Sequence, residues 1–367
     1  MADLYIGLIS GTSMDGIDAV LVSFEESGVQ IQATHSEPYP PALKASLLSA
    51  IRLPMDREPD ESGELHRQVG ISFRDAANAL ITSLGGDKQS IKAIGSHGQT
   101  LRHQPNAARP FSLQIGDANI IARDTGVTTV ANFRQADIDA GGQGAPLVPP
   151  FHEFLFRSAV KNRVVLNIGG IANVTVLPSA RSPITGFDTG PGNTLMDCWI
   201  REHRGEAFDE RGAWAAEGQV IDALLGEFLD DAYFVQLPPK STGFEYFNID
   251  WMHQKGVDQH HAIDVQTTLC ELSARTIASA VHDHADKTEE IFVCGGGVHN
   301  TELMRRLARN LEDVAISDTN AAGLDPDWVE AVAFAWLAKR TINDQTGNLP
   351  GVTGASHRVV LGTIHSP

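Results

Sequence analysis

Glycines and hydroxyl side chains are concentrated close to the N-terminus, in the stretch GLISGTSMDGID at residues 7–18. Apolar runs on both sides of this stretch predict two strands joined by a polar turn. Gly11 and Gly16 would let the backbone take a positive φ and come close to a ligand, and Thr12 and Ser13 add hydroxyl donors. Backbone N–H groups in such a turn can converge on an anion. The stretch could therefore hold a phosphate group, and a plain polar hairpin is the alternative.

A candidate base stands at the predicted end of a strand in the stretch GFDTGPGN, where Asp188 is followed by Gly190, Pro191 and Gly192. These three residues would hold the start of the next helix rigidly, so the carboxylate of Asp188 should project from the strand end. A carboxylate in such a position can serve as a general base. An Asp at a strand end more often forms a turn, but the position of Asp188 between glycine-rich phosphate candidates favours the catalytic role.

The stretch SGTSMDGID, next to an N-terminal strand, resembles the phosphate loop of the anhydro-N-acetylmuramic acid kinase family, which is part of the actin, Hsp70 and sugar kinase superfamily. Segments that resemble this family extend from residue 5 to about residue 340. The resemblance implies that the loop binds ATP through Gly11, Thr12, Ser13, Met14, Asp15, Gly16, Ile17 and Asp18. The superfamily usually carries an Asp just before these glycines, where this chain has Leu8, Ile9 and Ser10. The acid that orients Mg²⁺ must therefore come from elsewhere, and the metal ligands stay unknown.

Two further glycine motifs fit the same plan. Gly169 and Gly170, in the turn NIGGIAN, are the candidates for a second phosphate contact, with a plain β-turn as the alternative. Gly295, Gly296 and Gly297, in CGGGVHN, would lie under adenine and ribose, because the absence of side chains lets a flat base pack closely. The three glycines could instead simply cap a strand.

Polar side chains that could bind the sugar lie on two loops. His97, Gln99 and Thr100, in GSHGQT, offer the donors and acceptors that hydroxyl and acetamido groups need. Arg134, in ANFRQADID, carries a forked cation that suits a carboxylate. An ion pair with one of the two aspartates in the same stretch is the alternative for Arg134, and the aspartates could also hold the guanidinium until substrate arrives.

The resemblance implies a kinase that uses ATP, Mg²⁺ and water to convert 1,6-anhydro-N-acetylmuramic acid into N-acetylmuramic acid 6-phosphate in bacterial cell wall recycling. Asp188 would be its general base. Glu330, in the helical stretch DWVEAVAFAWLA, is a second catalytic candidate, because burial would raise the pKa of its carboxyl; a structural acid with a local partner is the alternative. The resemblance also implies a homodimer.

Two other classes of protein stay open. An ordinary sugar or carboxylate kinase would use Asp188 on a substrate hydroxyl and would not need water. A non-metabolic actin-like ATPase would hydrolyse ATP slowly and bind a protein partner, although the chain has no added peptide-binding domain and no obvious exposed apolar stripe.

Composition narrows the choice of partners and compartment. The net charge of −18 makes nucleic acid an unfavourable partner, because its phosphates would be repelled. Cys198, Cys270 and Cys294 lie far apart in apolar surroundings, as expected of buried thiols in a reducing compartment. No apolar run reaches the length of a membrane span and the N-terminus has no basic leader, so we expect a cytoplasmic protein.

The length of 367 residues and the order of elements predict two domains. The first half should run β-β-β-α-β-α-β, and the second half repeats this plan coarsely. We therefore expect an α/β protein with two ribonuclease-H-like domains, each with a mixed sheet, flanking a nucleotide cleft in the manner of actin-like ATPases and sugar kinases. The expected N-terminal domain is 1–140, with 343–367 packing back on it, and the expected C-terminal domain is 141–342. The glycines and prolines of 141–150 mark the passage between them.

Overall fold

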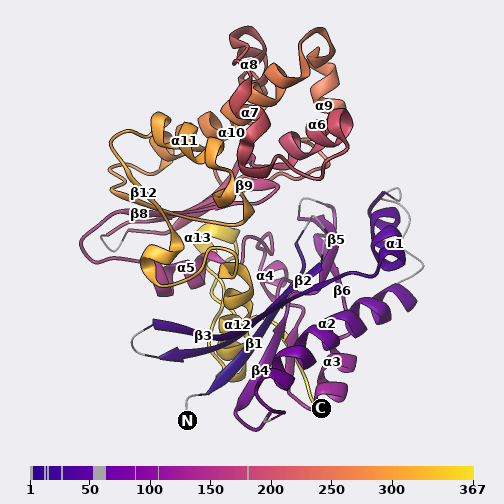
Figure 1. Ribbon diagram of the computed structural model, residues 1–367. Helices are drawn as coiled ribbons and strands as arrows, with labels where there is room; N and C mark the ends of the chain where they lie inside the picture. Colours follow the sequence, from indigo (N-terminus) through magenta and orange to yellow (C-terminus); the bar gives the residue numbers. More distant parts are fainter. Residues whose placement is uncertain are drawn as a thin grey trace. The chain divides into compact units, whose positions relative to one another are not determined.

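The computed structural model describes residues 3–11, 14, 16–25, 28–52, 63–86, 88–105, 107–179 and 182–367 (Figure 1). The chain divides into two compact units. Unit 1 combines Met1–Leu155 with Trp328–Pro367, and unit 2 is Phe156–Asp327. No helix in the described part of the chain is both long enough and apolar enough to cross a membrane.

Unit 1 is built on a six-stranded sheet in the order β13-β7-β4-β1-β2-β3. Its strands are β1 (Leu4–Ile9), β2 (Gly16–Glu25), β3 (Gly28–Pro38), β4 (Ile91–Ser96), β7 (Thr129–Ala131) and β13 (Thr363–His365). Strands β1, β2 and β3 are antiparallel neighbours, whereas β4 runs parallel to both β1 and β7. The sheet is therefore mixed.

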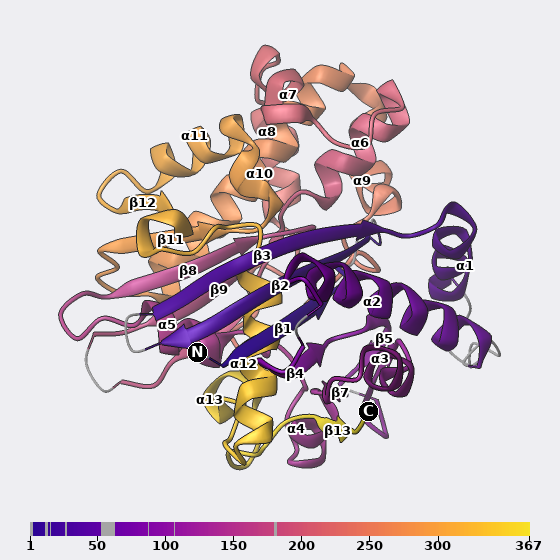
Figure 2. The same cartoon turned by 60° about the horizontal axis from the view of Figure 1, so that its bottom comes forward.

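Helices pack on both faces of this sheet. They are α1 (Pro41–Arg52), α2 (Glu64–Ser83), α3 (Ala118–Thr125), α4 (Gln135–Asp139), α12 (Val329–Ile342) and α13 (Pro350–Thr353); α5 (Pro149–Phe156) ends at the unit boundary. Ile6 and Leu8 of β1 share a core with Phe73 of α2. Gly7, on the opposite face of β1, meets the backbone of α12 at Ala331. Accordingly, α2 and α12 lie on opposite sides of the sheet (Figures 1 and 2).

The position of α12 differs from the expected domain boundaries. Residues 328–342 were expected in the C-terminal domain and 141–155 likewise, but both segments belong to unit 1. The reason is close backbone packing: a Cβ at Gly7 would strike the carbonyl oxygen of Ala331, and one at Gly95 would strike that of Phe334. Two glycines on adjacent parallel strands thus let α12 lie directly on the sheet.

Unit 2 repeats the plan with a five-stranded sheet in the order β10-β9-β8-β11-β12. Its strands are β8 (Arg163–Ile168), β9 (Ile171–Leu177), β10 (Thr185–Pro191), β11 (Glu290–Cys294) and β12 (Ala315–Asp318). The first three are antiparallel neighbours, and β11 runs parallel to β8 and β12. The predicted α/β class with a mixed sheet in each half is confirmed.

The helices of unit 2 form the larger of the two cores. They are α6 (Thr194–Arg204), α7 (Ala213–Glu217), α8 (Asp222–Leu229), α9 (Ile249–Gln254), α10 (Ala262–His284) and α11 (Thr301–Asn310), with short 3₁₀ turns η2 (Glu210–Gly212), η3 (Val257–Gln259), η4 (Gly296–His299) and η5 (Thr319–Ala322). Helix α10 is buried along most of its length beside α11 and the sheet (Figure 1). Cys270 and Cys294 are buried free thiols, and Cys198 is a partly buried one.

One element of unit 1 was not predicted. The stretch after Gly98 was expected to be a loop, but it forms a two-stranded antiparallel hairpin of β5 (Gln99–Gln104) and β6 (Phe111–Ile115). Gln99 and Thr100 therefore lie on a strand, which fixes the direction of their side chains.

Candidate active site

The N-terminal glycine turn connects β1 to β2, as predicted. Thr12, Ser13 and Asp15 lie outside the described residues. Around them, Met14 takes the left-handed conformation with φ of 53°, and its N–H donates to the carbonyl of Gly11 at 3.2 Å. The described part of the turn therefore closes back on Gly11, just after the first strand.

The described loop residues differ in what they offer a ligand. Met14 and Ile17 are buried among apolar side chains, whereas Gly11 and Asp18 are exposed. The expectation that Gly16 takes a positive φ is wrong. Gly16 is required instead by packing, because a Cβ there would strike the carbonyl oxygen of Glu37 and lie 2.9 Å from the Cα of Pro38.

Gln99 holds this turn in place from β5. Its buried side-chain oxygen accepts a hydrogen bond from Ser10 Oγ at 2.7 Å, and its Nε2 donates to the carbonyl of Gly11 at 3.3 Å. Tyr39 also donates to the same side-chain oxygen, at 3.4 Å. The amide of Gln99 is thus engaged by the phosphate-loop candidate, a role that the sequence analysis missed.

His97 and Arg134 form a hydrogen-bonded pair in unit 1, in which His97 is buried and Arg134 is partly buried. His97 is 7% exposed, and its Nδ1–H donates to the carbonyl of Gly98 at 3.0 Å. Its Nε2 accepts from Arg134 Nη2 at 2.9 Å and from Nε at 3.3 Å. Burial, together with the charge of Arg134, holds the pKa of His97 well below its usual value. The histidine is therefore neutral beside the guanidinium.

The ion pair considered for Arg134 is absent from the described residues. Arg134 Nη1 donates to the carbonyl of Gly144 at 3.0 Å. Asp137 is fully buried, and its carboxylate accepts hydrogen bonds from Gly144 N–H and from side chains of the segment 348–353. Asp139 accepts instead from a glutamine one turn earlier on α4. The carboxyl that acts on the positive charge of Arg134 is instead that of Glu330.

Glu330, at the start of α12, lies close to two charged groups of unit 1. Burial raises the pKa of its carboxyl, the charge of Asp18 raises it further, and that of Arg134 lowers it. Burial also lowers the pKa of Arg134, to about 10. The structure therefore places Asp18, Arg134 and Glu330, three of the predicted site residues, within electrostatic reach of one another.

Asp188 lies within β10, beside a bulge, and not at the end of the strand as expected. The register slips between Asp188 and Gly190. Burial raises the pKa of Asp188 to about 7, and the negative charge of Glu245 also raises it. The hydrogen bond from the N–H of Thr242 and the positive charge of Lys240 lower the pKa. A carboxyl that titrates near neutral pH is well matched to general base catalysis.

The segment 233–245 holds Asp188 and was not singled out from the sequence. Thr242 N–H donates to Asp188 Oδ2 at 3.0 Å, and the Asp188 N–H donates to the carbonyl of Lys240 at 3.1 Å. Tyr233 donates its hydroxyl to the Asp188 carbonyl at 2.8 Å. Lys240 is 9% exposed, and burial lowers its pKa although Asp188 opposes that change. The signal in the sequence that could have identified this segment is the lysine of the irregular stretch LPPKSTG, which the structure shows to be buried.

The two glycine motifs of unit 2 meet at the end of β8. The carbonyls of Gly169 and Gly170 accept hydrogen bonds from the first N–H groups of the α6 region, at 2.8 to 3.0 Å. Gly295 has a φ of 79°, and a Cβ there would strike Asn167. A Cβ at Gly296 would meet no atom within 4 Å. Gly296 therefore faces open space, as a glycine that a ligand approaches should.

Gly297, by contrast, is needed for the fold, because a Cβ there would strike the side chain of Ile168. The 3₁₀ turn η4 begins at Gly296, within this glycine run, and Asn300 then caps α11 by accepting from the N–H of Leu303 at 3.0 Å. The alternative interpretation of the glycines as a strand cap thus applies to part of the motif only.

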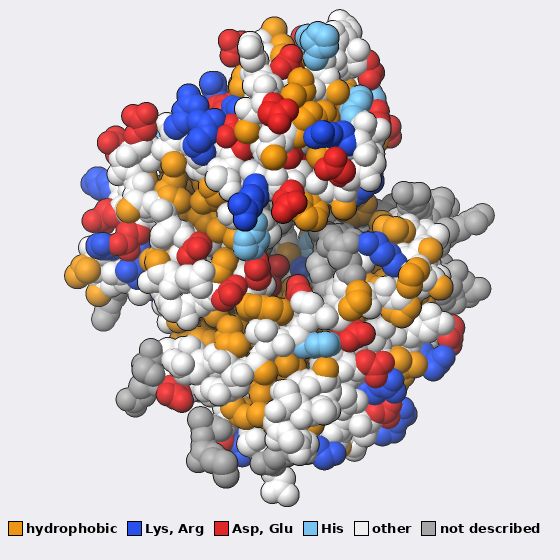
Figure 3. Space-filling view, in the orientation of Figure 1, with side chains coloured by type: hydrophobic (Ala, Val, Ile, Leu, Met, Phe, Trp, Pro, Cys, Tyr) orange, Lys and Arg blue, Asp and Glu red, His pale blue; other side chains and the backbone are white. Residues whose placement is uncertain are grey.

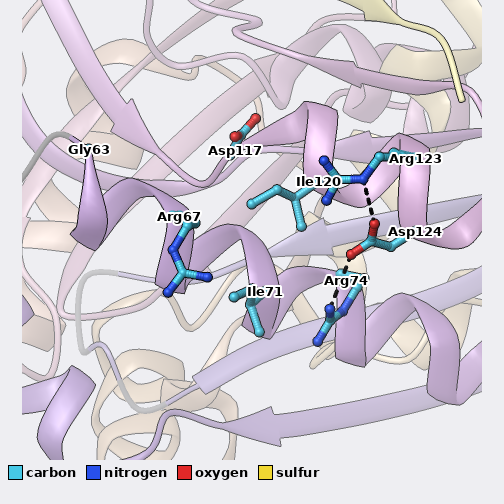
Figure 4. Close-up of a pocket in the computed structure, with 8 residues that line it drawn as sticks. All are labelled: Gly63, Arg67, Ile71, Arg74, Asp117, Ile120, Arg123 and Asp124. Carbon is cyan, nitrogen blue, oxygen red and sulfur yellow. Dashed lines mark hydrogen bonds and ion pairs between the residues drawn. The ribbon is translucent and has the colours of Figure 1, made fainter.

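A pocket between α2 and α3 is separate from all of these residues. Figure 4 shows Arg67, Arg74 and Arg123 on its wall. Arg74 and Arg123 pair with Asp124 at 3.1 and 2.8 Å, and Arg67 pairs with Glu64 at 2.8 Å. Each of these arginines pairs with a carboxylate, and none of the predicted site residues lines the pocket. We therefore do not assign the active site to this pocket.

The face of the molecule drawn in Figure 3 shows no broad positive patch among the described residues. On the face drawn in Figure 3, Lys and Arg side chains lie in separate groups among Asp and Glu. With a net charge of −18, local groups such as Arg134 and Lys240 must supply the attraction for phosphate or carboxylate.

Comparisons with known proteins agree over the whole chain. A family model described as anhydro-N-acetylmuramic acid kinase matches residues 3–367. The anhydro-N-acetylmuramic acid kinase of Shewanella halifaxensis is 49% identical over 363 residues, which cover 98% of each chain. That of Coxiella burnetii is 47% identical over 363 residues, covering 98% of this chain and 97% of the relative. Among solved structures, xylulose kinase from Rhodospirillum rubrum is 13% identical, with a TM-score of 0.46 over 98% of this chain and 94% of that one.

Proposed function

The chain belongs to the anhydro-N-acetylmuramic acid kinase family, and we propose that it uses ATP and water to convert 1,6-anhydro-N-acetylmuramic acid into N-acetylmuramic acid 6-phosphate. This reaction serves the recycling of cell wall peptidoglycan. The observation that carries the mechanism is the environment of Asp188, where partial burial raises the pKa of the carboxyl to about 7. About half of such carboxyls are ionised at neutral pH, and the ionised form is basic enough to accept a proton.

In this mechanism Asp188 takes a proton from water, whose oxygen attacks the anomeric carbon C1 of the sugar. The bond between C1 and O6 breaks, and O6 attacks the γ-phosphorus of ATP while the bond from phosphorus to the bridging oxygen of ADP breaks. Capture of the phosphoryl group neutralises the leaving O6. One base therefore serves both bond changes, and no general acid is needed.

The sugar is bound by groups of unit 1. Arg134 binds the lactyl carboxylate, because its guanidinium carries a full charge and its described partners, His97 and a backbone carbonyl, are neutral. His97 acts on the substrate through Arg134, and Gln99 acts through the turn that it holds. Thr100, the neighbour of Gln99 on β5, presents its hydroxyl on the same hairpin.

ATP is bound by three groups of glycine-rich residues. The turn of residues 11–18 holds phosphate oxygens, and Gly169 and Gly170 make the second phosphate contact. Gly295, Gly296 and Gly297 accommodate the adenosine, and the open space at Gly296 supports this assignment.

The carboxylates of Asp18 and Glu330 fit Mg²⁺, which proteins hold with one or two carboxylates together with substrate phosphates. Asp18 is exposed and its charge raises the pKa of Glu330, so a cation would relieve their repulsion. No group of three acidic, histidine or cysteine side chains suited to a metal occurs among the described residues. When bound, Mg²⁺ would neutralise negative charge on the phosphates.

A panel of sugars assayed for ADP release tests the proposed function. With 1,6-anhydro-N-acetylmuramic acid, the ADP released should be proportional to the sugar consumed. With reducing sugars, which have no anhydro ring, little ADP should be released. Equal turnover of ordinary hexoses would favour a general sugar kinase. ADP release without any sugar, or polymerisation with ATP, would favour an actin-like ATPase.

Two further properties follow from the resemblance to the family. We propose that the chain works as a homodimer in the cytoplasm. Sedimentation equilibrium at micromolar concentration measures the first property directly, and a monomer at all concentrations would contradict it. Fractionation of cells that express the natural protein measures the second.

A further inference from the structure

The β5–β6 hairpin of unit 1 gathers polar side chains on one face. Thr100 pairs with Gln114 and His103 pairs with Ser112, and the register slips between them. Without that slip, Thr100 and His103 would point to opposite faces, because they are three residues apart. The bulge turns His103 to the side of Thr100, which is the use that bulges often serve at functional sites.

Hydrogen bonds confirm that these four side chains share a face. Gln114 Nε2 donates to Ser112 Oγ at 2.7 Å and to Thr100 Oγ1 at 3.2 Å. Ser112 Oγ also lies 3.0 Å from His103 Nδ1. Ser112 thus links the glutamine to the histidine and fixes both side chains.

This network leaves two atoms without a partner among the described residues. They are His103 Nε2 and Gln114 Oε1, and both are shielded from solvent. A polar atom that is shielded and unpaired costs stability, so native proteins rarely leave two together without a purpose. Since both side chains bond to the same Ser112 hydroxyl, the two unpaired atoms belong to one small region of the hairpin.

The two atoms differ in what they offer. Burial, together with the charge of Arg134, lowers the pKa of His103 to about 4, so the imidazole is neutral. The Ser112 hydroxyl faces His103 Nδ1 at 3.0 Å and, at the longer distance of 3.4 Å, the backbone carbonyl of Arg102. In the tautomer in which Nδ1 accepts this proton, Nε2 carries the ring proton and is a donor. Gln114 Oε1 can only accept. One neutral donor beside one neutral acceptor matches an amide, which has one carbonyl and one N–H, and it disfavours an anion.

We propose that His103 and Gln114 form the subsite for the 2-acetamido group of the amino sugar. His103 Nε2–H donates to the acetamido carbonyl, and Gln114 Oε1 accepts from the acetamido N–H. The inference rests on the proposed function and adds two specificity-determining residues to it.

The position of Arg134 supports this assignment independently. Helix α4, which begins directly after Arg134, contacts β6 of the hairpin, and the charge of Arg134 acts on His103. In muramic acid the lactyl ether is on C3 and the acetamido group is on the adjacent carbon, C2. Groups that bind the two substituents must therefore be neighbours, as Arg134 and His103 are.

The test compares two sugars that differ only at C2. One is 1,6-anhydro-N-acetylmuramic acid, and the other carries a hydroxyl in place of the acetamido group and keeps the lactyl ether. Wild type should prefer the first. His103→Phe keeps a ring of similar size, and Gln114→Met keeps the length of the side chain. Each should lower kcat/KM for the acetamido sugar about tenfold and scarcely change it for the hydroxyl sugar, since a lost hydrogen bond of this kind has that effect.

His35→Phe is the matched control, because His35 is a partly buried histidine of β3 whose partner is Glu37. It should leave the ratio of the two sugars unchanged. Melting curves identify any variant that fails to fold, and the two hairpin variants test the inference independently. An equal loss with both sugars would make His103 and Gln114 structural, and equal use of both sugars by wild type would show that no acetamido subsite exists. In either case sugar-dependent ADP release by wild type would still stand, so failure of the inference is distinguishable from failure of the proposed function.

Discussion

Arg134 directs two of its N–H groups at a single ring nitrogen of His97, with Nη2 at 2.9 Å and Nε at 3.3 Å from Nε2. A guanidinium can only donate, so Nε2 must be unprotonated, and the ring proton stays on Nδ1, which donates to the carbonyl of Gly98. His97 therefore fixes the guanidinium without cancelling its charge. In the proposed complex, an anionic group of the substrate would meet a cation that is already oriented.

Arg134→Ala should reduce kcat/KM for the anhydromuramic substrate by about 10- to 100-fold, because a hydrogen bond to a charged group contributes about 1.5 to 3 kcal/mol. The control sugar is the anhydro-N-acetylglucosamine analogue, which lacks the lactyl carboxylate. Wild type should use this analogue poorly, and the substitution should scarcely alter that rate. Steady-state kinetics with both sugars measures the difference. The same loss with both would show that Arg134 acts on phosphate or on loop order.

The charges around Asp188 predict opposite shifts of the pH profile. The group must be ionised to act as a base, so kcat/KM should rise with pH through an apparent pKa of about 7. Glu245 raises this pKa, so Glu245→Gln should move the rise to lower pH. Lys240 lowers it, so Lys240→Met should move the rise to higher pH.

Glu312→Gln is the matched control for this pair, because Glu312 is an exposed glutamate of unit 2 that is not among the charges acting on Asp188. Its pH profile should coincide with that of wild type. Shifts of the same sign in Glu245→Gln and Lys240→Met would mean that the profile reports a different group.

Asp188→Asn should lower kcat by about 10²- to 10⁴-fold while nucleotide binding is retained, since the change removes basicity and keeps shape. The same variant should be more stable than wild type at pH 8. The folded state raises the pKa of Asp188 from 3.8 to about 7, so the stability of wild type falls as pH rises through this window. The gain in the free energy of unfolding is at most about 1.4 kcal/mol for each pKa unit of that shift. Because Asp188 is partly exposed, screening by solvent makes the gain smaller.

Melting temperatures of both proteins between pH 4 and 8 measure this effect. The advantage of Asp188→Asn should shrink towards pH 4, where the carboxyl is protonated in the folded state. A variant with near wild-type turnover would make Asp188 structural. A stability difference that does not depend on pH would show that its carboxyl does not titrate near neutrality.

Gly296→Ala separates a glycine that a ligand needs from one that the fold needs. A Cβ at Gly296 meets no atom within 4 Å, so the melting temperature should not change. Nucleotide affinity should fall about tenfold, which corresponds to about 1.4 kcal/mol, because the methyl group would occupy the space of the adenosine. Gly297→Ala should instead lower stability, since its Cβ strikes Ile168. Titration calorimetry decides the matter: unchanged nucleotide affinity in Gly296→Ala would remove this loop from the nucleotide site.

The parts of the fold that the sequence predicted are those with strong local patterns. Apolar runs on both sides of a glycine turn identified β1 and β2. The glycine motifs were recognised from their composition, and Asp188 was expected at the end of a strand but lies within β10. These signals depend on neighbours in the chain, so they can be recognised without tertiary structure.

The rest depended on contacts between distant residues. The hairpin β5–β6 is polar on the face of Thr100 and contains a bulge, so its pattern does not alternate and it was taken for a loop. Gly7 belongs to the phosphate-loop motif, yet its role is to let the backbone of α12 pack closely against β1. Helix α12 lies more than 300 positions later in the sequence. The segment that holds Asp188 is irregular, and only its hydrogen bonds to β10 reveal its role.

The fate of the water oxygen tests the central claim most directly. The reaction should be run in water labelled with ¹⁸O and analysed by mass spectrometry, with unlabelled product incubated in the same water to correct for exchange at C1. The proposed mechanism predicts one labelled oxygen on C1 of N-acetylmuramic acid 6-phosphate and one ADP for each molecule formed. A phosphorylated sugar that keeps its anhydro ring and carries no label would contradict it.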